Sequence, residues 1–256
     1  MIHHGLKPVR PDHRDFSHSR TFGSITQFPD EFDTDAGMTN PDQNADGLPY
    51  GCTGYTQAEL CTDEDKLVYK PKYTYEKTCL MEGHDDTEGC DIRTSLKSLL
   101  VYGAQETTET SDMEAFQHRR GAYYAVEPVG DYFDGIRSAL MKSGSVSVGT
   151  PWYWNFTSQG IVTAPSSYEN DPYSWHNWKV CGWKTINGQP YLKAKPWIGE
   201  YRWFPRDVIN HLLSQTYTGA FVVDRFQGEN TQLVEISLYE TVLSYLYRAL
   251  ELLKLR

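Results

Sequence analysis

The feature that most limits the fold of this chain is a change in hydrophobic period near residue 145. Apolar residues before it recur at helical spacing and predict helices at 52–66, 95–102 and 131–143. Apolar and polar residues after it alternate and predict strands at 146–150, 175–183, 191–194 and 219–224. Asn187-Gly188 is typical of a hairpin turn between two of these strands. Helices followed by antiparallel strands predict an α+β fold with two lobes.

Charge and hydropathy exclude several functional classes. The 256 residues carry a net charge of -10, which argues against a nucleic-acid partner because a phosphate backbone would be repelled. An apolar run of about 18 residues, the length that spans a bilayer, is missing, so we predict no membrane span. The N-terminus has no charged start followed by an apolar core, so we predict no signal peptide. We therefore expect a cytoplasmic or particle-associated protein, and we predict no cofactor.

The C-terminal stretch 228–256 differs from the rest of the chain. Its apolar residues are spaced alternately by three and four, as in a heptad seam: Ile236, Tyr239, Leu243, Leu246, Leu250 and Leu253. We therefore divide the chain into a domain at 1–227 and an amphipathic helix at 228–256. This helix either packs back on the domain or joins copies of the chain or another protein in a larger assembly, and both alternatives stay open.

The chain has five cysteines and an N-terminal group of histidines. The missing secretion signal favours reduced thiols. A disulfide between Cys79 and Cys90 stays open, because these two residues flank a turn-rich loop. The N-terminal histidines have no partner cysteines or histidines at metal-ligand spacing, so we predict no metal site.

Cys52 has the sequence surroundings of a reactive thiol. It follows Gly51 and opens the predicted helix at 52–66. A helix N-terminus stabilises a thiolate, and a nearby imidazole does so further. His176 lies far downstream in a predicted strand between Trp175 and Trp178, where it could supply that imidazole. This layout is typical of a nucleophilic cysteine with a histidine base, although a lone cysteine at a helix start is most often a small buried residue.

Several short motifs follow one another in the order found in papain-like cysteine peptidases, which the chain resembles over roughly residues 13–225. The motifs are Phe28-Pro29-Asp30-Glu31-Phe32-Asp33, Gln43, Gly51-Cys52, Gly144-Ser145-Val146-Ser147-Val148, Gly160-Ile161, His176 six residues before Gly182-Trp183, and the run from Tyr191 to Trp197. Each motif is weak alone, but their shared order is fairly specific.

The resemblance implies a papain-like two-lobed fold, with a helical lobe, an antiparallel β-barrel-like lobe and the C-terminal helix added. It implies a peptidase of the bacterial or phage type, without a propeptide, acting on a peptide or protein. Cys52 would be the nucleophile, His176 the base and Gln43 an oxyanion donor. The resemblance also implies three residues that border the substrate or shield the site: Val146, Trp175 and Trp197.

The third catalytic position departs from the family pattern. Matching Trp197 to the tryptophan of the family places Lys195 where the family has the asparagine that orients the histidine. A cation there would oppose the thiolate–imidazolium pair. Asn177 and a backbone carbonyl are the other candidates for the orienting group. The family's usual disulfide to the position of Cys90 is also missing, because Pro49 replaces its partner.

Three functions are consistent with these patterns. The first is a papain-like cysteine peptidase that hydrolyses peptide bonds. The second is a catalytically weakened domain that acts as a structural or attachment module of a larger assembly, such as a virion, through residues 228–256. The third is a thiol amidase that acts on peptidoglycan or isopeptide links with the same residues.

Overall fold

The computed structural model describes residues 5–10, 12–37, 43, 46–156, 160–165, 174–196 and 201–225. The helices are α1 His18–Phe22, α2 Cys52–Asp65, α3 Pro71–Glu82, α4 Ile92–Val101, α5 Asp112–Ala115, α6 Tyr132–Ser143 and α7 Arg206–Ser214, with short 3-10 turns at Phe116–His118 and Trp154–Phe156. The strands are β1 Glu31–Asp33, β2 Arg120–Ala125, β3 Val146–Trp152, β4 Gly160–Ile161, β5 Ser174–Ile186, β6 Gln189–Lys195, β7 Arg202–Pro205 and β8 Gly219–Arg225. The predicted helix at 228–256 lies outside the described residues, and no described helix is long and apolar enough to cross a membrane.

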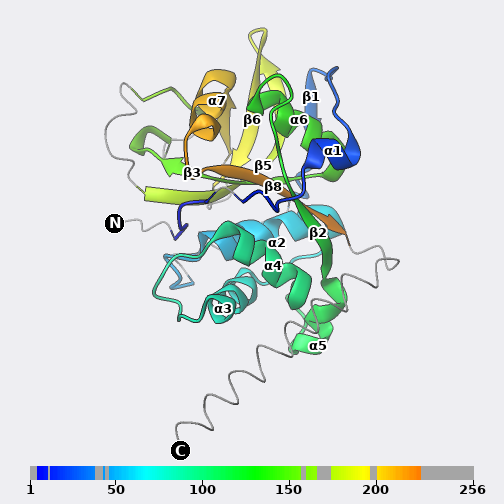
Figure 1. Ribbon diagram of the computed structural model, residues 1–256, viewed down its shortest axis with the longest axis vertical. Coiled ribbons are helices and arrows are strands. Elements are labelled where there is room, and N and C mark those ends of the chain that lie inside the picture. Colours follow the sequence, from blue (N-terminus) through cyan, green and yellow to red (C-terminus); the bar gives the residue numbers. More distant parts are fainter. Residues whose placement is uncertain are drawn as a thin grey trace, which may run out of the picture.

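One sheet joins all the strands of the described chain. Its order is β2-β8-β3-β5-β6-β7-β4, and β1 pairs with β5. The pairs are antiparallel except for β4 with β7. Figure 1 shows most of the sheet with α6 and α7 in the upper half, and α2, α3 and α4 together in the lower half. The α+β architecture with a helical part and an antiparallel sheet is therefore confirmed.

Strand β3 separates two hydrophobic cores. Val146 and Val148 are fully buried in the core that the sheet shares with α6 and α7. Because side chains alternate along a strand, Ser147 and Gly149 face the other way, toward α2 and α4. A Cβ atom on Gly149 would come 2.9 Å from a methyl carbon of Leu6, so the glycine makes room for the N-terminal segment.

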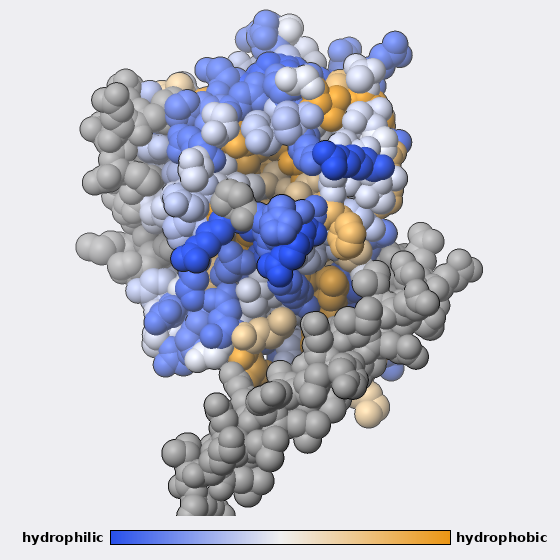
Figure 2. All heavy atoms as spheres, in the orientation of Figure 1, coloured by the Kyte–Doolittle hydropathy of each residue, from blue (hydrophilic) through white to orange (hydrophobic). Residues whose placement is uncertain are grey.

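Apolar side chains are concentrated in these two cores and in a smaller third cluster that contains Tyr75, Cys79 and Cys90. Figure 2 shows hydrophilic side chains over most of the visible described face, with hydrophobic residues in scattered patches. Large exposed apolar residues include Phe16 and Met113, and exposed apolar side chains are normal on a protein surface.

Several elements, among them helices α3 and α7 and strand β2, were not predicted from the sequence. Helix α3 has few aliphatic residues and shows no clear apolar stripe, although Pro71 at its first turn is a start signal. Helix α7 is short, and its buried stripe is Val208, Ile209, Leu212 and Leu213. Strand β2 lies in the first half of the chain, yet it pairs with β8 at the end of the sheet. Long-range pairing of this kind leaves little local signal.

Close packing of α2 on α3 generates a stability prediction. A Cβ atom on Gly54 of α2 would lie 2.5 Å from the Cβ and 2.6 Å from the backbone nitrogen of Tyr75 in α3. Gly54→Ala should therefore lower the free energy of unfolding by about 1–3 kcal/mol, although alanine normally stabilises a helix. Urea unfolding measures this change, with Lys97→Ala on the exposed face of α4 as the control. A stabilised Gly54→Ala protein would contradict the packing of α2 on α3.

Candidate active site

Cys52 is the first residue of α2, and its side chain is buried. Gly51 caps the helix without a side-chain hydrogen bond, so the thiol lies among the open backbone N–H groups of the helix start. The residue is 1% exposed. Burial raises the pKa of the Cys52 thiol to about 12, against the opposing effect of backbone hydrogen bonds from Asn177 and Gly5. In this structure Cys52 is therefore a protonated thiol at neutral pH.

His176 lies on β5, one residue before the Asn177 backbone that contacts the Cys52 thiol. It is fully buried, and its ring packs edge-on against Trp152 with the centroids 5.0 Å apart. Its Nε2 lies 3.1 Å from the backbone oxygen of Pro196. A carbonyl can only accept, so Nε2 carries the proton, and Nδ1 is the nitrogen that can take up a further one. The strand thus brings the predicted base into the neighbourhood of the predicted nucleophile.

Side chains from α2 fix this neighbourhood. The Thr56 hydroxyl donates to the Asn177 carbonyl at 3.0 Å, and the Gln57 amide donates to the Asn177 side-chain oxygen at 3.1 Å. Gln57 also donates to the Ser147 hydroxyl on β3 at 3.0 Å. These buried bonds hold the first turns of α2 against β5 and β3.

The two side chains named as candidates for orienting His176 make their described contacts elsewhere. The amide nitrogen of Asn177 donates to Ser147 Oγ and to the Val148 carbonyl, both at 2.9 Å. The Nζ atom of Lys195 forms an ion pair with Glu59 at 3.1 Å. Among the described residues, the carbonyl of Pro196 lies within hydrogen-bond distance of His176 Nε2. The sequence suggested a backbone carbonyl as one candidate but held no signal for which residue would supply it.

The other predicted site residues are distributed as follows. Gln43 is fully buried in the loop before Cys52, and its amide nitrogen donates to the Pro49 carbonyl at 3.3 Å. Val146 lies in the core on the α6 side of the sheet. Trp175 is partly buried and packs against the cluster that contains Cys52. Trp197 lies outside the described residues.

An N-terminal segment, residues 5–9, covers Cys52. Leu6 and Val9 are 5% and 1% exposed and belong to the same buried cluster as Cys52. The Cys90 N–H donates to the Gly5 carbonyl at 2.7 Å, and the Lys7 N–H donates to the Cys90 carbonyl at 3.0 Å. Figure 1 shows this segment, in dark blue, passing between the helical part and the sheet. The segment therefore occupies the junction where the candidate site lies.

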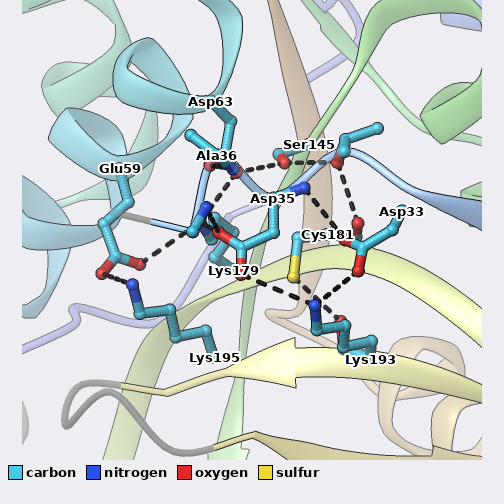
Figure 3. Close-up of polar contacts among 12 residues, drawn as sticks. Asp33, Asp35, Ala36, Glu59, Asp63, Ser145, Lys179, Cys181, Lys193 and Lys195 are labelled. Atoms are coloured by element: carbon cyan, nitrogen blue, oxygen red, sulfur yellow. Dashed lines mark hydrogen bonds and ion pairs between the residues drawn. The ribbon is translucent and has the colours of Figure 1, made fainter. Parts of the chain in front are cut away.

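A network of buried charges links α2 to the sheet on the other side of this junction (Figure 3). The Lys179 side chain on β5 is 1% exposed and forms ion pairs with Asp63 at 2.7 Å, Asp35 at 3.4 Å and Glu59 at 3.9 Å. Burial alone lowers the pKa of Lys179, but the carboxylates of Glu59 and Asp63 outweigh it and raise the pKa above its ordinary value. Lys179 therefore stays charged inside the protein.

Lys179 also affects the pKa values of the carboxyl groups in this network. Burial alone raises the pKa of Asp35, but Lys179 and a hydrogen bond from Tyr201 outweigh it and hold this pKa below its ordinary value. A lowered carboxyl pKa stabilises the fold above the ordinary carboxyl pKa of about 4 and loses that effect as the pH falls through the lowered value. Burial raises the pKa of Glu59, against the opposing charges of Lys179 and Lys195.

Comparisons with known proteins support the fold. No family model and no curated protein matches the sequence. Among solved structures, the chain is similar to xylellain, a cysteine protease from Xylella fastidiosa, at 16% identity and a TM-score of 0.69, covering 88% of this chain and 96% of that one.

Two further structures agree. Digestive procathepsin L2 proteinase from the larval midgut of Tenebrio molitor matches at 17% identity and a TM-score of 0.66, covering 87% of this chain and 78% of that one. Procathepsin B S9 from Trypanosoma congolense matches at 16% identity and a TM-score of 0.60, covering 88% and 87%. The predicted papain-like fold is therefore confirmed.

The charge network predicts a pH-dependent loss of stability on removing its cation. Lys179→Met leaves the buried Asp63 carboxylate without its ion pair and should lower the free energy of unfolding by about 3–5 kcal/mol at neutral pH. The deficit should shrink near the ordinary carboxyl pKa of about 4, because protonation removes the unpaired negative charge. Urea unfolding across this pH range measures it. Lys184→Met, on the same strand but over the Trp203 ring, is the control. A loss of stability that is the same at neutral pH and near the ordinary carboxyl pKa would contradict the assignment of these ion pairs.

Because residues 5–9 cover Cys52, we expect that loosening them exposes the Cys52 thiol. The double variant Leu6→Ala and Val9→Ala should speed alkylation of Cys52 by iodoacetamide, because loosening the segment hydrates the thiol and lowers its pKa toward the ordinary value of about 8.5. Peptide mapping isolates Cys52 from the other cysteines. Leu80→Ala, at a side chain that is 39% exposed, is the control. An unchanged rate would show that residues 5–9 do not limit access.

Proposed function

We propose that the protein is a papain-like cysteine peptidase that hydrolyses peptide bonds through Cys52. The observation that carries the proposal is the placement of Cys52 at the N-terminus of α2, hydrogen-bonded to the backbone of the residue that follows His176. This arrangement occurs in a fold shared with cysteine proteases. The sequence predicted Cys52 as nucleophile, His176 as base and a papain-like fold together, and the placement of the two residues is consistent with these roles.

The proposed reaction begins with proton transfer from the Cys52 thiol to Nδ1 of His176. The thiolate attacks the carbonyl carbon of the scissile peptide bond and forms a C–S bond, while the carbonyl oxygen becomes an oxyanion. The Cys52 N–H and the Gln43 amide would donate to this oxyanion. The C–N bond then breaks, and His176 gives its proton to the leaving amine. Water, deprotonated by His176, hydrolyses the resulting thioester and restores the thiol.

In this proposal the carbonyl of Pro196 orients His176. It accepts the Nε2–H of His176, which fixes the tautomer that leaves Nδ1 as the base. A carbonyl dipole also stabilises the imidazolium formed during the reaction. The ion pair of Lys195 with Glu59 offsets the positive charge that would otherwise disfavour that imidazolium.

The contacts of residues 5–9 suggest how a substrate binds. Gly5 and Lys7 use the N–H and the carbonyl of Cys90, as an added extended strand would. An extended peptide substrate would take the same backbone partners after this segment is displaced. The peptidase would therefore recognise main-chain groups at Cys90, and apolar side chains would fit the places of Leu6 and Val9.

Peptide hydrolysis by matched variants tests the proposal. Cys52→Ala should abolish cleavage of a fluorescent peptide library, and His176→Ala should lower it by at least about 10³-fold, because nucleophile and base act as a unit. Cys61→Ala, at another buried cysteine of α2, should leave the rate unchanged. In the wild type, iodoacetamide labelling of Cys52 should depend on His176 across the pH range. Cleavage that survives Cys52→Ala, or labelling indifferent to His176, would overturn the proposal.

The second candidate function is a catalytically weakened domain that serves as a structural or attachment module. The observation in its favour is the raised pKa of the covered Cys52 thiol, which is a poor nucleophile in this state. Under this alternative the predicted helix at 228–256 would make the functional contact with a larger assembly. Cys52→Ala would then leave assembly intact, and neither the Leu6 and Val9 variant nor the wild type would cleave any peptide.

A further inference from the structure

A second group of sulfur and imidazole side chains lies at the end of α3. The Sγ atoms of Cys79 and Cys90 are 3.7 Å apart, and Nε2 of His84 is 3.9 Å from Sγ of Cys90. All three potential ligand atoms lie within 4.8 Å of one another. Both cysteines are buried free thiols. Three residues of this chemistry converge here outside the candidate active site.

The end of α3 creates this convergence. Gly83 adopts a left-handed conformation with φ of 78°, and the backbone N–H groups of Gly83 and His84 return to the Cys79 carbonyl at 2.9 and 3.2 Å. The chain therefore turns back at His84 toward the sulfur of Cys79. Further along, the buried Tyr75 hydroxyl donates to the Glu88 carbonyl at 2.6 Å, which holds the loop that brings in Cys90.

The imidazole of His84 is held with one nitrogen toward the sulfurs. Its Nδ1 donates to the Asp85 carbonyl at 2.5 Å, so Nε2 is the nitrogen that faces Cys90. Metal-ligating histidines commonly donate their other ring N–H to a carbonyl or a carboxylate in this way. Nε2 also lies 3.1 Å from Oε2 of Glu82, whose other oxygen accepts the Asp91 N–H at 2.7 Å.

We propose that Cys79, His84 and Cys90 bind one zinc-class divalent ion in a tetrahedral site. Two thiolates 2.3 Å from a tetrahedral zinc ion lie about 3.8 Å apart, close to the 3.7 Å between these sulfurs. The sulfur-to-nitrogen edge of such a site is about 3.6 Å. Nε2 of His84 lies 3.9 Å from the Cys90 sulfur and within 4.8 Å of the Cys79 sulfur, so the imidazole moves inward when the ion binds. A water molecule fills the fourth position.

Zinc binding changes the protonation of the proposed ligands. Zinc binding releases the thiol protons and the Nε2 proton that His84 shares with Glu82. A disulfide would use only the two sulfurs and would not involve His84. The sequence spacing alone predicted no metal site, because the turn at Gly83 is a property of the folded chain.

The ion would also stabilise the edge that receives residues 5–9. Cys90 supplies both a sulfur to the proposed site and the backbone groups that bind Gly5 and Lys7. The Lys7 Nζ atom pairs with Glu82 at 2.6 Å, next to His84. The site therefore fixes the position of Cys90, whether or not the protein is a peptidase.

Metal content and cobalt spectroscopy on the full chain test this proposal. The chain, reduced with a phosphine and incubated with zinc, should retain one ion after gel filtration. Removing a residue that only supports a metal ligand typically lowers metal affinity by about 10–100-fold. The variants Cys79→Ser, Cys90→Ser and His84→Ala should lower the zinc affinity by at least that factor. Cys61→Ser and His118→Ala are the matched controls and should keep the ion.

A ligand exchange distinguishes loss of the site from loss of the fold. His84→Cys should still bind cobalt(II) and should strengthen the thiolate-to-cobalt absorption of a tetrahedral site, which a misfolded variant would not do. Removing the ion with a chelator should lower the melting temperature, and zinc should restore it. A wild type that retains no more zinc than Cys79→Ser would overturn the proposal. A protein mass that is lower by two hydrogens, with Cys79 and Cys90 joined as a disulfide, would also overturn the proposal.

Discussion

The burial of Lys179 between three carboxylates is the interaction on which the arrangement of the two parts of the molecule depends. Its ammonium group comes from β5, and Glu59 and Asp63 come from α2. Buried charges tolerate little displacement, because separation from their partners leaves them without water or counter-charge. The helix is thereby held in one position on the sheet. The candidate nucleophile at its first residue and the candidate base on β5 are positioned by the same constraint.

The contacts that position Cys52 also suppress its reactivity. The thiol lies at a helix N-terminus beside backbone N–H groups, which favours a thiolate, yet its burial in the cluster that includes Leu6 and Val9 raises its pKa to about 12. The desolvation effect is the larger of the two, so the described state is a closed one. The two candidate functions, peptidase and attachment module, differ in whether residues 5–9 leave the junction between the helical part and the sheet. Both functions are compatible with the same resting structure.

Cys90 connects the two sulfur-containing regions of the protein. Its backbone pairs with Gly5 and Lys7 above Cys52, while its side chain points to Cys79 and His84. The family resemblance implied that a disulfide to this position is missing because of Pro49. The proposed ion would supply a comparable restraint from other residues, drawn from the end of α3 instead of the loop before α2. Rigidity at this edge is useful to any function that binds an extended chain there.

The sequence by itself determined the α+β class, the helices α4 and α6, the long strands β3, β5 and β6, and the position of Cys52 at a helix start. These follow from local periodicity and from glycine turns, which act over a few residues. Helix α3 was missed because it lacks a clear stripe. Only the tertiary structure decided that Pro196 contacts His176, that residues 5–9 cover Cys52, and that Cys79, His84 and Cys90 converge. A backbone carbonyl carries no side-chain identity, and burial and long-range contacts arise only when distant segments pack together.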